Sequence, residues 1–299
     1  SMHLPLAVWL SKHPWQAAIL AACLGVLSLQ GAVLFVVPAS AIPVLLTLEH
    51  GPRIGGNVML AVSAVMIGCL MWYQQPVWFA ITYALVLFAL PMMLADLLRR
   101  TGSMNLVFQL TLVAALVTLA LVYVLLPQPN VFWEQFLGRA FDALSQSGIQ
   151  FDESLVPQLA RTLWGAMVAV LLLTVLNSLF LARWWQSLIH SQGAFGFEFR
   201  RLSAGVILGV VLVAISVVAL VADFASVDCM AWVAMLGLAL QGLASAHRRK
   251  AEGRLPRGWL IVIYVMLMVP FFSFVTVALL AGWGLADVWR YMRNSGLQA

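Results

Sequence analysis

Charge is the scarcest property of this sequence. Only 9% of the 299 residues are Asp, Glu, Lys or Arg, whereas 63% are hydrophobic, and the mean hydropathy is +0.99. A soluble domain averages about 25% charged and about 45–50% apolar residues. With so few charged residues, the folded chain cannot have a surface polar enough for a water-soluble protein. The composition therefore excludes a soluble enzyme and an intrinsically disordered chain, and it predicts a polytopic membrane protein.

Cysteine is also scarce. Cys23, Cys69 and Cys229 lie within or at the edge of apolar segments, without Cys-x-x-Cys spacing and without a nearby histidine cluster. This pattern excludes a secreted module held together by disulfides, and it does not predict a metal site or a redox centre. We interpret the three cysteines as small core residues.

The chain lacks the motifs of ATP hydrolysis and of the common hydrolases. It has no GxxxxGK[ST] phosphate loop, no HExxH and no GxSxG. The only acidic residue well inside a predicted span is Asp96. Arg99 and Arg100 lie within one helical turn of it, which favours an interfacial ion pair over a catalytic group. We therefore expect no enzymatic activity, no cofactor and no bound metal.

Apolar runs long enough to cross a bilayer account for most of the chain. A helix needs about 20 apolar residues to cross a hydrocarbon core of about 30 Å. The sequence therefore predicts an all-α transmembrane helical bundle of eight or nine spans. The candidate spans are Trp15 to Leu34, Val37 to Leu48, Asn57 to Trp72, Val77 to Leu98, Met104 to Leu126, Arg161 to Trp184, Ser203 to Ala222, Cys229 to Ala246 and Trp259 to Ala281.

Prolines leave three of these spans, the first two and the last, open to alternatives. From Trp15 to Leu48 the chain is apolar for 34 residues, about 51 Å of helix, which is too long for one straight span. Pro38 and Pro43 are expected to break it, giving either two helices or one helix and a re-entrant piece. In the last span, Pro270 leaves open a broken helix that returns the C-terminus to the inner side.

The distribution of basic residues predicts the orientation of the spans, because cytoplasmic loops collect Lys and Arg. With nine spans and the N-terminus inside, twelve of the sixteen basic and four of the eleven acidic residues fall on the inner side, so the net charge is +8 inside and −3 outside. The inner basic residues are Lys12, Arg53, Arg99, Arg100, Arg183, Arg200, Arg201, Arg248, Arg249, Lys250, Arg254 and Arg257; the outer charges are Arg139, Arg161, Arg290, Arg293, Glu134, Asp142, Asp152, Glu153, Asp223, Asp228 and Asp287. We expect a multi-pass protein of the bacterial inner membrane with a cytoplasmic N-terminus and no nucleic-acid partner.

Two extramembrane segments are long enough to have structure of their own. In the outer loop, apolar residues recur at helical spacing across 131–146 and predict an amphipathic helix that lies on the membrane surface or covers the bundle. In the inner loop from Trp185 to Leu202, Phe195, Phe197 and Phe199 alternate. We expect this segment to dock against the bundle from the cytoplasmic side.

Polar and aromatic groups near the outer ends of the spans are candidates for a ligand site. An intramembrane polar group needs a partner, and pockets combine apolar walls with a few polar groups. Each of these residues could equally tie two helices together or anchor a span at the interface. The candidate ligand-binding residues are Gln30, Ser40, Tyr73, Gln74, Trp78, Asn130 and Trp133.

Small residues and the inner-face loops supply further candidates. Ala18 with Ala22, and Gly205 with Gly209, are spaced for close helix–helix or partner contact. The segment Glu49-His50-Gly51-Pro52-Arg53 could be a proton relay, but its Gly and Pro favour a tight turn at a helix end. The remaining candidates of the inner-face loops are Arg200, Arg201, Arg248, Arg249 and Lys250.

Several short motifs suggest a family. The proline-containing run Val37-Pro38-Ala-Ser-Ala-Ile-Pro43 is followed by His50-Gly51-Pro52-Arg53-Ile-Gly55, and later come Leu176 to Arg183 and Phe195 to Leu202. Together they resemble the YybS-like family of bacterial membrane proteins, and more distantly the S components of energy-coupling-factor transporters. The resemblance covers nearly the whole chain.

The resemblance implies a function and a division of the chain. S components have six spans, bind a vitamin or metal ion from outside, and contact a coupling subunit through an alanine pair, which Ala18 and Ala22 match. Their substrate loops match the positions of Ser40, Tyr73 to Trp78 and Asn130 to Trp133. Residues 2–184 would form the S-component-like bundle, and residues 185–299 a cytoplasmic loop and a three-span extension that S components lack.

Two functions fit these observations. The first is a non-enzymatic transport subunit that binds a small molecule or lipid from the outer side, with an energising partner protein. Trp78 and Trp133 would stack the ligand, and Gln30, Ser40 and Gln74 would orient it. The second is a structural or assembly protein of the cell envelope that recruits a protein partner or anionic membrane lipids through its inner arginine-rich loops.

Overall fold

The computed structural model describes residues 3–148, 152–256 and 258–295, and within these ranges every regular element is a helix. In this part of the chain, seven helices are long and apolar enough to cross a membrane. An eighth span results if Ala194–Arg200 and Gly205–Val221, which meet at a bend of 56°, count as one. The protein is therefore a polytopic helical bundle. The predicted Arg257 lies outside the described residues.

The chain forms two compact units, which are described separately. Unit 1 comprises Ser1–Phe108 and Leu173–Arg201, and unit 2 comprises Gln109–Leu172 and Leu202–Ala299. The 35-residue helix α9 (Val156–His190) contributes its first half to unit 2 and its second half to unit 1. The units thus do not follow the boundary at residue 185 that the sequence suggests.

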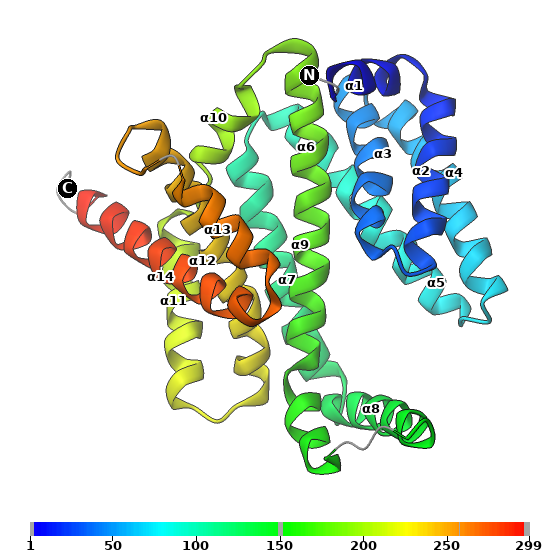
Figure 1. The fold of residues 1–299 in the computed structure, drawn as a ribbon, viewed down its shortest axis with the longest axis vertical. Coiled ribbons are helices and arrows are strands. Elements are labelled where there is room, and N and C mark those ends of the chain that lie inside the picture. The colour runs from blue at the N-terminus through cyan, green and yellow to red at the C-terminus, as the bar shows by residue number, and fades with distance from the viewer. Residues whose placement is uncertain (1–2, 149–151, 257, 296–299) are drawn as a thin grey trace. The chain divides into compact units, whose positions relative to one another are not determined.

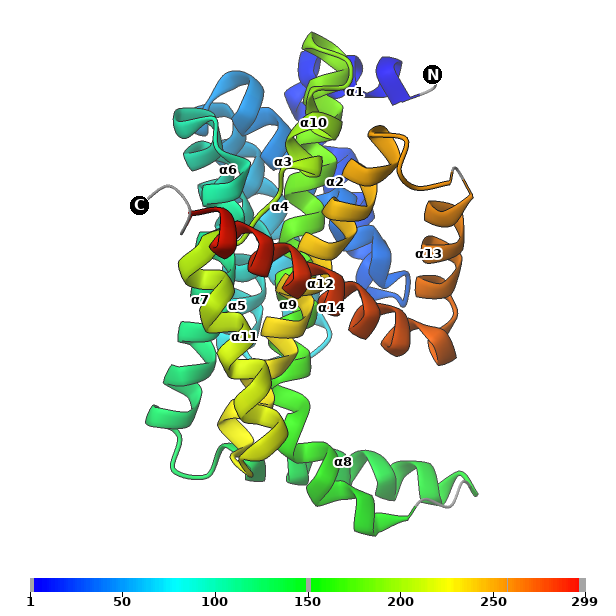
Figure 2. The same cartoon turned by 90° about the vertical axis from the view of Figure 1, so that its left-hand side faces the viewer.

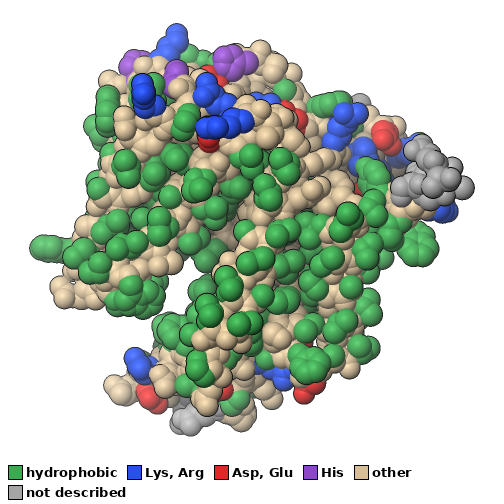
Figure 3. All heavy atoms as spheres, turned by 180° about the vertical axis from the view of Figure 1, so that it is seen from behind, with side chains coloured by type: hydrophobic (Ala, Val, Ile, Leu, Met, Phe, Trp, Pro, Cys, Tyr) green, Lys and Arg blue, Asp and Glu red, His purple; other side chains and the backbone are tan. Residues whose placement is uncertain are grey.

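Unit 1 is built around one central helix. Its elements are α1 (His3–Lys12), α2 (Pro14–Leu29), η1 (Val33–Phe35), α3 (Val36–His50), α4 (Pro52–Trp72), α5 (Val77–Ala84), the π-helical η2 (Leu85–Ala89), α6 (Leu90–Thr101), the second half of α9, and α10 (Ala194–Arg200). Every residue of α3 from Ala39 to Leu48 is buried. Figure 3 shows Lys, Arg and His side chains gathered at one end of this unit and hydrophobic side chains over the flanks of its helices.

The ambiguous first apolar run consists of two separate helices, but the break is not at the prolines. The chain leaves α2 after Leu29 and turns at Gly31, whose φ of 109° favours glycine. Pro38 lies in the first turn of α3, where its missing N–H needs no partner. Pro43 lies inside α3 and cannot donate a backbone hydrogen bond, but the helix continues through it and is buried from Ala39 to Leu48. The expectation that Pro38 and Pro43 break the run was wrong.

The predicted inner-loop segment contains a short helix, α10 (Ala194–Arg200). In α10, Phe195 and Phe199 are one helical turn apart, and both rings pack against Phe180 of α9, with centroids 6.0 and 5.7 Å away. Phe197 points elsewhere, and the Arg201 guanidinium lies 4.4 Å from its ring centroid. The segment does dock on a helix, but through spacing of four residues, not through alternation.

Unit 2 contains the α8 surface helix and a helical hairpin. Its elements are α7 (Met104–Leu125) from Gln109 onward, α8 (Pro129–Gln146), η3 (Glu153–Leu155), the first half of α9, α11 (Gly205–Val221), α12 (Ala225–Ala251), α13 (Trp259–Met268) and α14 (Pro270–Ser295). Figures 1 and 2 both show α11 and α12 running side by side in opposite directions, and α8 running across the start of α9.

Two glycines let α12 and α14 touch backbone to backbone. A Cβ added to Gly242 would lie 1.9 Å from the Leu280 carbonyl oxygen, and one added to Gly284 would lie 2.0 Å from the Leu238 carbonyl oxygen. No side chain fits at either distance. Small residues at such crossings are typical of helix packing in membranes. This contact fixes where α14 crosses α12.

The last predicted span is broken and folds back. The chain turns between α13 and α14 at Val269 and Pro270, and α14 then runs to the end of α12 where the Arg248 guanidinium lies 2.7 Å from the Asp287 carboxylate (Figure 2). Asp287 therefore lies at the same end of unit 2 as Arg248, and the nine-span assignment of Asp287, Arg290 and Arg293 to the opposite side was wrong. Pro270 supplies the physical reason, because it cannot continue the ladder of α13.

Candidate functional site

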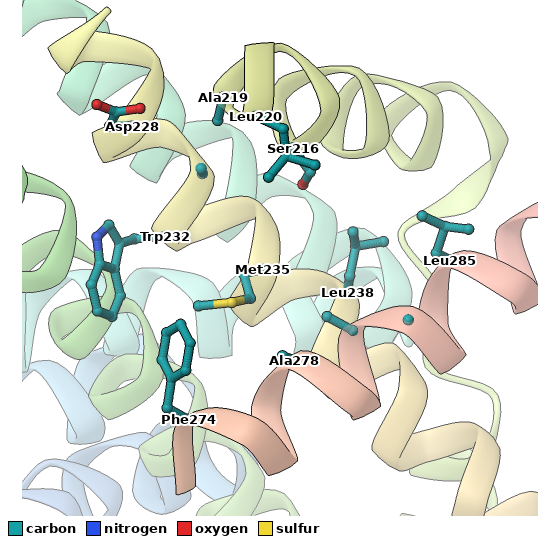
Figure 4. Close-up of a pocket in the computed structure, with 13 residues that line it drawn as sticks. Ser216, Ala219, Leu220, Asp228, Trp232, Met235, Leu238, Phe274, Ala278 and Leu285 are labelled. Atoms are coloured by element: carbon teal, nitrogen blue, oxygen red, sulfur yellow. The ribbon is translucent and has the colours of Figure 1, made fainter. Parts of the chain in front are cut away.

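An apolar groove of about 470 Å³ opens in unit 2 between α11, α12 and α14 (Figure 4). Small residues leave the space, because Ala219, Ala231, Ala278 and Gly282 stand where larger side chains would close it. The wall also includes large apolar groups. The lining residues are Ser216, Ala219, Leu220, Asp228, Ala231, Trp232, Met235, Leu238, Phe274, Ala278, Ala281, Gly282 and Leu285. This volume lies within the range of about 300–1,000 Å³ that is usual for ligand pockets.

The polarity of the groove is confined to one end. Among the described residues that line it, Asp228 alone is charged. The Ser216 hydroxyl donates to the Leu212 carbonyl at 2.8 Å, so its hydrogen is already used within α11. In Figure 4, Asp228 lies at one end of the labelled side chains and Leu285 toward the other. The groove thus has an apolar body and a single anionic end.

The anionic end continues into an ion-paired cluster, which we call the acidic end (Arg161, Asp223 and Asp228). The Arg161 Nε donates to the Asp228 carboxylate at 2.8 Å, and its Nη2 contacts the Asp223 carboxylate. The Asp228 side chain is 24% exposed and the Asp223 side chain 90% exposed. One cation faces two anions here, so the cluster carries a net charge of −1.

Buried polar groups support the acidic end from behind. The Cys229 thiol donates to the Arg161 carbonyl at 3.3 Å and lies 3.2 Å from the Tyr123 hydroxyl, which in turn lies 3.3 Å from the Asn130 Oδ1. A Cβ on Gly165 would lie 2.5 Å from the Cys229 backbone, so α9 and α12 approach closely here. These contacts hold Arg161 next to the start of α12. The arrangement can bind a ligand, but it presents no nucleophile paired with a base, in the part of the chain described.

A second hollow, of about 340 Å³, lies beside α8. It is lined by Glu134, Gly138, Phe141, Asp142, Val156 and Pro157. The α8 helix is attached to α9 by aromatic contacts, because the rings of Phe132 and Trp133 each lie 5.4 Å from that of Trp164. The Trp164 indole N–H donates to the Pro129 carbonyl at 2.7 Å.

The predicted ligand residues of unit 1 lie at the ends of three helices. Gln30 is exposed at the end of α2, Tyr73 and Gln74 are exposed after α4, and Trp78 is exposed in α5. Gln74 has a φ of 59°, an unusual conformation for a residue other than glycine. Ser40 is different, because it is buried in α3 and its hydroxyl has no hydrogen-bond partner among the described residues. These residues line neither of the two hollows described above.

The other two predicted ligand residues belong to unit 2. Asn130 accepts a hydrogen bond from Tyr123, and Trp133 packs in the aromatic contact between α8 and α9. The Trp133 indole nitrogen is buried, and no hydrogen-bond partner for it lies in the part of the chain that the structure describes. Since Trp78 lies in unit 1 and Trp133 in unit 2, their joint stacking on a ligand remains a prediction.

The small-residue pairs occupy packed positions. Ala18 is buried within unit 1 and Ala22 is half-buried, so Ala18 offers little surface to another protein. In unit 2, a Cβ on Gly209 would lie 2.9 Å from the Val288 side chain, so Gly209 serves the contact between α11 and α14. Gly205, with a φ of 74°, begins α11 beside Gln109.

Two of the residues of unit 1 that are predicted to face the inner side contact other helices. The segment from Glu49 to Arg53 is a turn between α3 and α4, where Gly51 has a φ of 91° and Arg53 is exposed. The Glu49 carboxylate lies 2.8 Å from the His190 imidazole of α9. The His50 imidazole lies 2.7 Å from the Ser11 carbonyl of α1. Both side chains therefore contact other helices, which the turn interpretation alone does not predict.

Several arginines that are predicted to face the inner side have partners within the chain. Arg248 pairs with Asp287, and the Arg249 guanidinium lies 4.9 Å from the Trp283 ring centroid. Arg201 lies on Phe197, and Arg200 also has a partner. Lys250 is exposed at the end of α12. These contacts reduce the positive surface that could recruit a partner.

Sequence reasoning missed the groove. Its residues were grouped into ordinary spans, and Arg161, Asp223 and Asp228 were counted only as outer charges. One local signal was available, because Asp228, Trp232 and Met235 recur at helical spacing and share one face of α12. The contribution of α14 could not be found this way, since it depends on where the last helix folds back.

The fold places this chain in the class of polytopic α-helical membrane proteins, with an apolar groove that ends in an acidic cluster. No family model matches the chain, and neither a curated protein nor a solved structure is significantly similar to it. The resemblance to the YybS-like family and to S components therefore stays a prediction.

Proposed function

We propose that this protein is a non-enzymatic subunit of the bacterial inner membrane that binds an amphipathic small molecule or lipid from the outer side. The observation that carries the proposal is the groove of unit 2, which combines an apolar body with a charged end. An apolar chain gains by leaving water along such walls, and a few polar groups fix its orientation. If the protein transports its ligand, a partner must supply the energy, because the sequence has no phosphate loop.

The charge count supports binding from the outer side. Asp223, Asp228 and Arg161 lie in loops or helix ends that carry net negative charge, whereas Arg248, Arg249 and Lys250 mark the opposite end of α12. The groove then opens toward the outer leaflet. The assembly-protein alternative has weaker support, since Arg201, Arg248 and Arg249 already have partners within the chain.

Photocrosslinking from inside the groove tests the proposal. Met235 is replaced by p-benzoylphenylalanine, the protein is purified in detergent, and adducts are identified by mass spectrometry. The matched control carries the same group at Ile207 of α11, which is 85% exposed and lies outside the groove. We expect a discrete adduct that survives detergent washing at position 235 only. Equal adducts at both positions would show annular lipid alone and would overturn the proposal.

A groove-filling variant provides the second arm. Ala278→Phe adds bulk to the α14 wall of the groove. We expect it to abolish the adduct at position 235 while the protein remains monodisperse. An unchanged adduct in Ala278→Phe would show that the captured molecule does not lie in the groove.

A further inference from the structure

We propose that the acidic end selects lipids whose headgroup carries a primary ammonium group. This inference rests on the proposed function, because it names the class of ligand that the groove takes. Its basis is the juxtaposition of the apolar groove with Asp228, which lines it, and with Asp223, which shares Arg161.

The charge balance favours a cation over an anion. Arg161 is the one basic residue of the cluster, and both aspartates contact it. Its positive charge is therefore more than neutralised by the two carboxylates, and the net charge of −1 remains for a ligand. A phosphate without a counter-charge would lie next to two carboxylates, and the like charges would repel one another. A headgroup with an ammonium group removes the imbalance.

The geometry favours a primary over a quaternary ammonium. Carboxylate oxygens accept several hydrogen bonds, and an –NH₃⁺ group has three donors. Asp228 uses its Oδ2 on Arg161, and both aspartate side chains are accessible. A quaternary ammonium has no N–H to donate and binds best in cages of aromatic rings. Trp232 is the only Trp or Tyr among the described residues that line the groove.

The apolar body of the groove favours a lipid over a free amine as the ligand. Apart from Ser216 and Asp228 its lining is apolar, and such walls favour a hydrocarbon chain over water. The charged cluster lies at the end of the same groove, so one molecule with a chain and a headgroup can reach both. The shape thus fits an amphiphile such as phosphatidylethanolamine.

A comparison of lipid headgroups in nanodiscs tests the inference. The protein is reconstituted with phosphatidylethanolamine, phosphatidylcholine or phosphatidylglycerol that carry the same diazirine-labelled acyl chain, and labelled groove peptides are quantified. We expect phosphatidylethanolamine to label the groove about three- to fivefold more than the other two, the factor of an exposed ion pair of up to about 1 kcal/mol. Free ethanolamine at the same concentration should not displace it.

Variants at the acidic end locate the preference. Asp228→Asn should remove it, and Asp223→Asn should reduce it; because the Asp223 side chain is largely exposed, the second variant stays informative if the first does not fold. Asp152→Asn, in another segment predicted to lie on the outer side, is the matched control and should keep the full preference.

The outcomes separate this inference from the proposed function. Equal groove labelling by all three lipids would overturn the ammonium preference and leave lipid binding intact. Equal labelling by phosphatidylethanolamine and phosphatidylcholine would show that the cluster does not distinguish a primary from a quaternary ammonium group. The strongest labelling by phosphatidylglycerol would show that Arg161 binds the phosphate. Either result would overturn the inference. An unlabelled groove would overturn the proposed function as well.

Discussion

Unit 2 contains two ion-paired clusters along α12, and they differ in burial and balance. At one end, Arg248 meets a single carboxylate, that of Asp287, whose side chain is 5% exposed. At the acidic end, Arg161 meets two carboxylates, and both remain accessible. A buried and balanced pair ties two helices together, because separating its groups would leave a buried charge without its counter-charge. An accessible cluster with surplus charge contributes little to stability and can take a partner.

The crossing of α12 and α14, next to the Arg248–Asp287 pair, should be the most sensitive to substitution. Gly284→Leu places a side chain where even a Cβ would lie 2.0 Å from the Leu238 carbonyl oxygen. We expect loss of monodisperse protein in detergent, measured by size-exclusion chromatography. Gly282→Leu, two residues away, is the control and should fold, because a Cβ added to Gly282 would lie within 4 Å of no atom of another helix in the described part of the chain. Equal behaviour of the two variants would contradict the tight crossing of α12 and α14.

Removing the buried carboxylate should have the next largest effect. Asp287→Ala leaves the Arg248 guanidinium without its carboxylate, and we expect a loss of about 3 kcal/mol in unfolding free energy. The measurement is thermal unfolding in detergent. The double variant Arg248→Met with Asp287→Leu should recover most of the loss, since an apolar pair has no charge to desolvate. If the double variant is no better than the single one, the pair is not the source of the effect.

The corresponding change at the acidic end should cost much less. Asp228→Asn leaves Arg161 with Asp223, and the side chains involved are partly exposed. We expect a loss below about 1 kcal/mol in the same unfolding assay, together with the loss of headgroup preference described above. A loss as large as that of Asp287→Ala would show that both clusters are structural, and the distinction between them would fail.

Asp223→Asn should have the smallest effect on stability. Its side chain is 90% exposed, and exposed ion pairs contribute about 0.2–1 kcal/mol at most. We expect an unfolding midpoint close to that of the unchanged protein, and a reduced phosphatidylethanolamine preference. A clear drop in the midpoint would indicate that Asp223 anchors the turn between α11 and α12.

The contrast between the clusters also shows what the sequence could predict. The helical class, the surface helix near 131–146 and most spans follow from hydropathy, which depends only on local residues. The break at Gly31 and the packing of Phe195 and Phe199 depend on which neighbours cover the prolines and the rings. Asp287 was assigned to the wrong side because a charge count cannot detect that α14 folds back.

The candidate site was harder to predict than the fold. Asp228, Trp232 and Met235 share one face of α12, but Phe274 and Ala278 join them only through the crossing at Gly242 and Gly284. Such a site combines residues that are about fifty positions apart in the chain, and no local pattern marks them. The predicted outer aromatic residues are exposed or half-buried, as interfacial anchors also are.

The turn at Pro270 has a consequence for the width of unit 2. The ten residues of α13 extend only about 15 Å, half of the hydrocarbon thickness of about 30 Å. Because α14 returns toward Arg248, the turn between α13 and α14 does not reach the loop between α11 and α12 (Figures 1 and 2). Unit 2 is therefore wider beside the hairpin than at the α11–α12 loop, and a hydrocarbon chain bound in the groove would fill part of that difference. Ligand occupancy and the shape of the surrounding membrane would then be coupled.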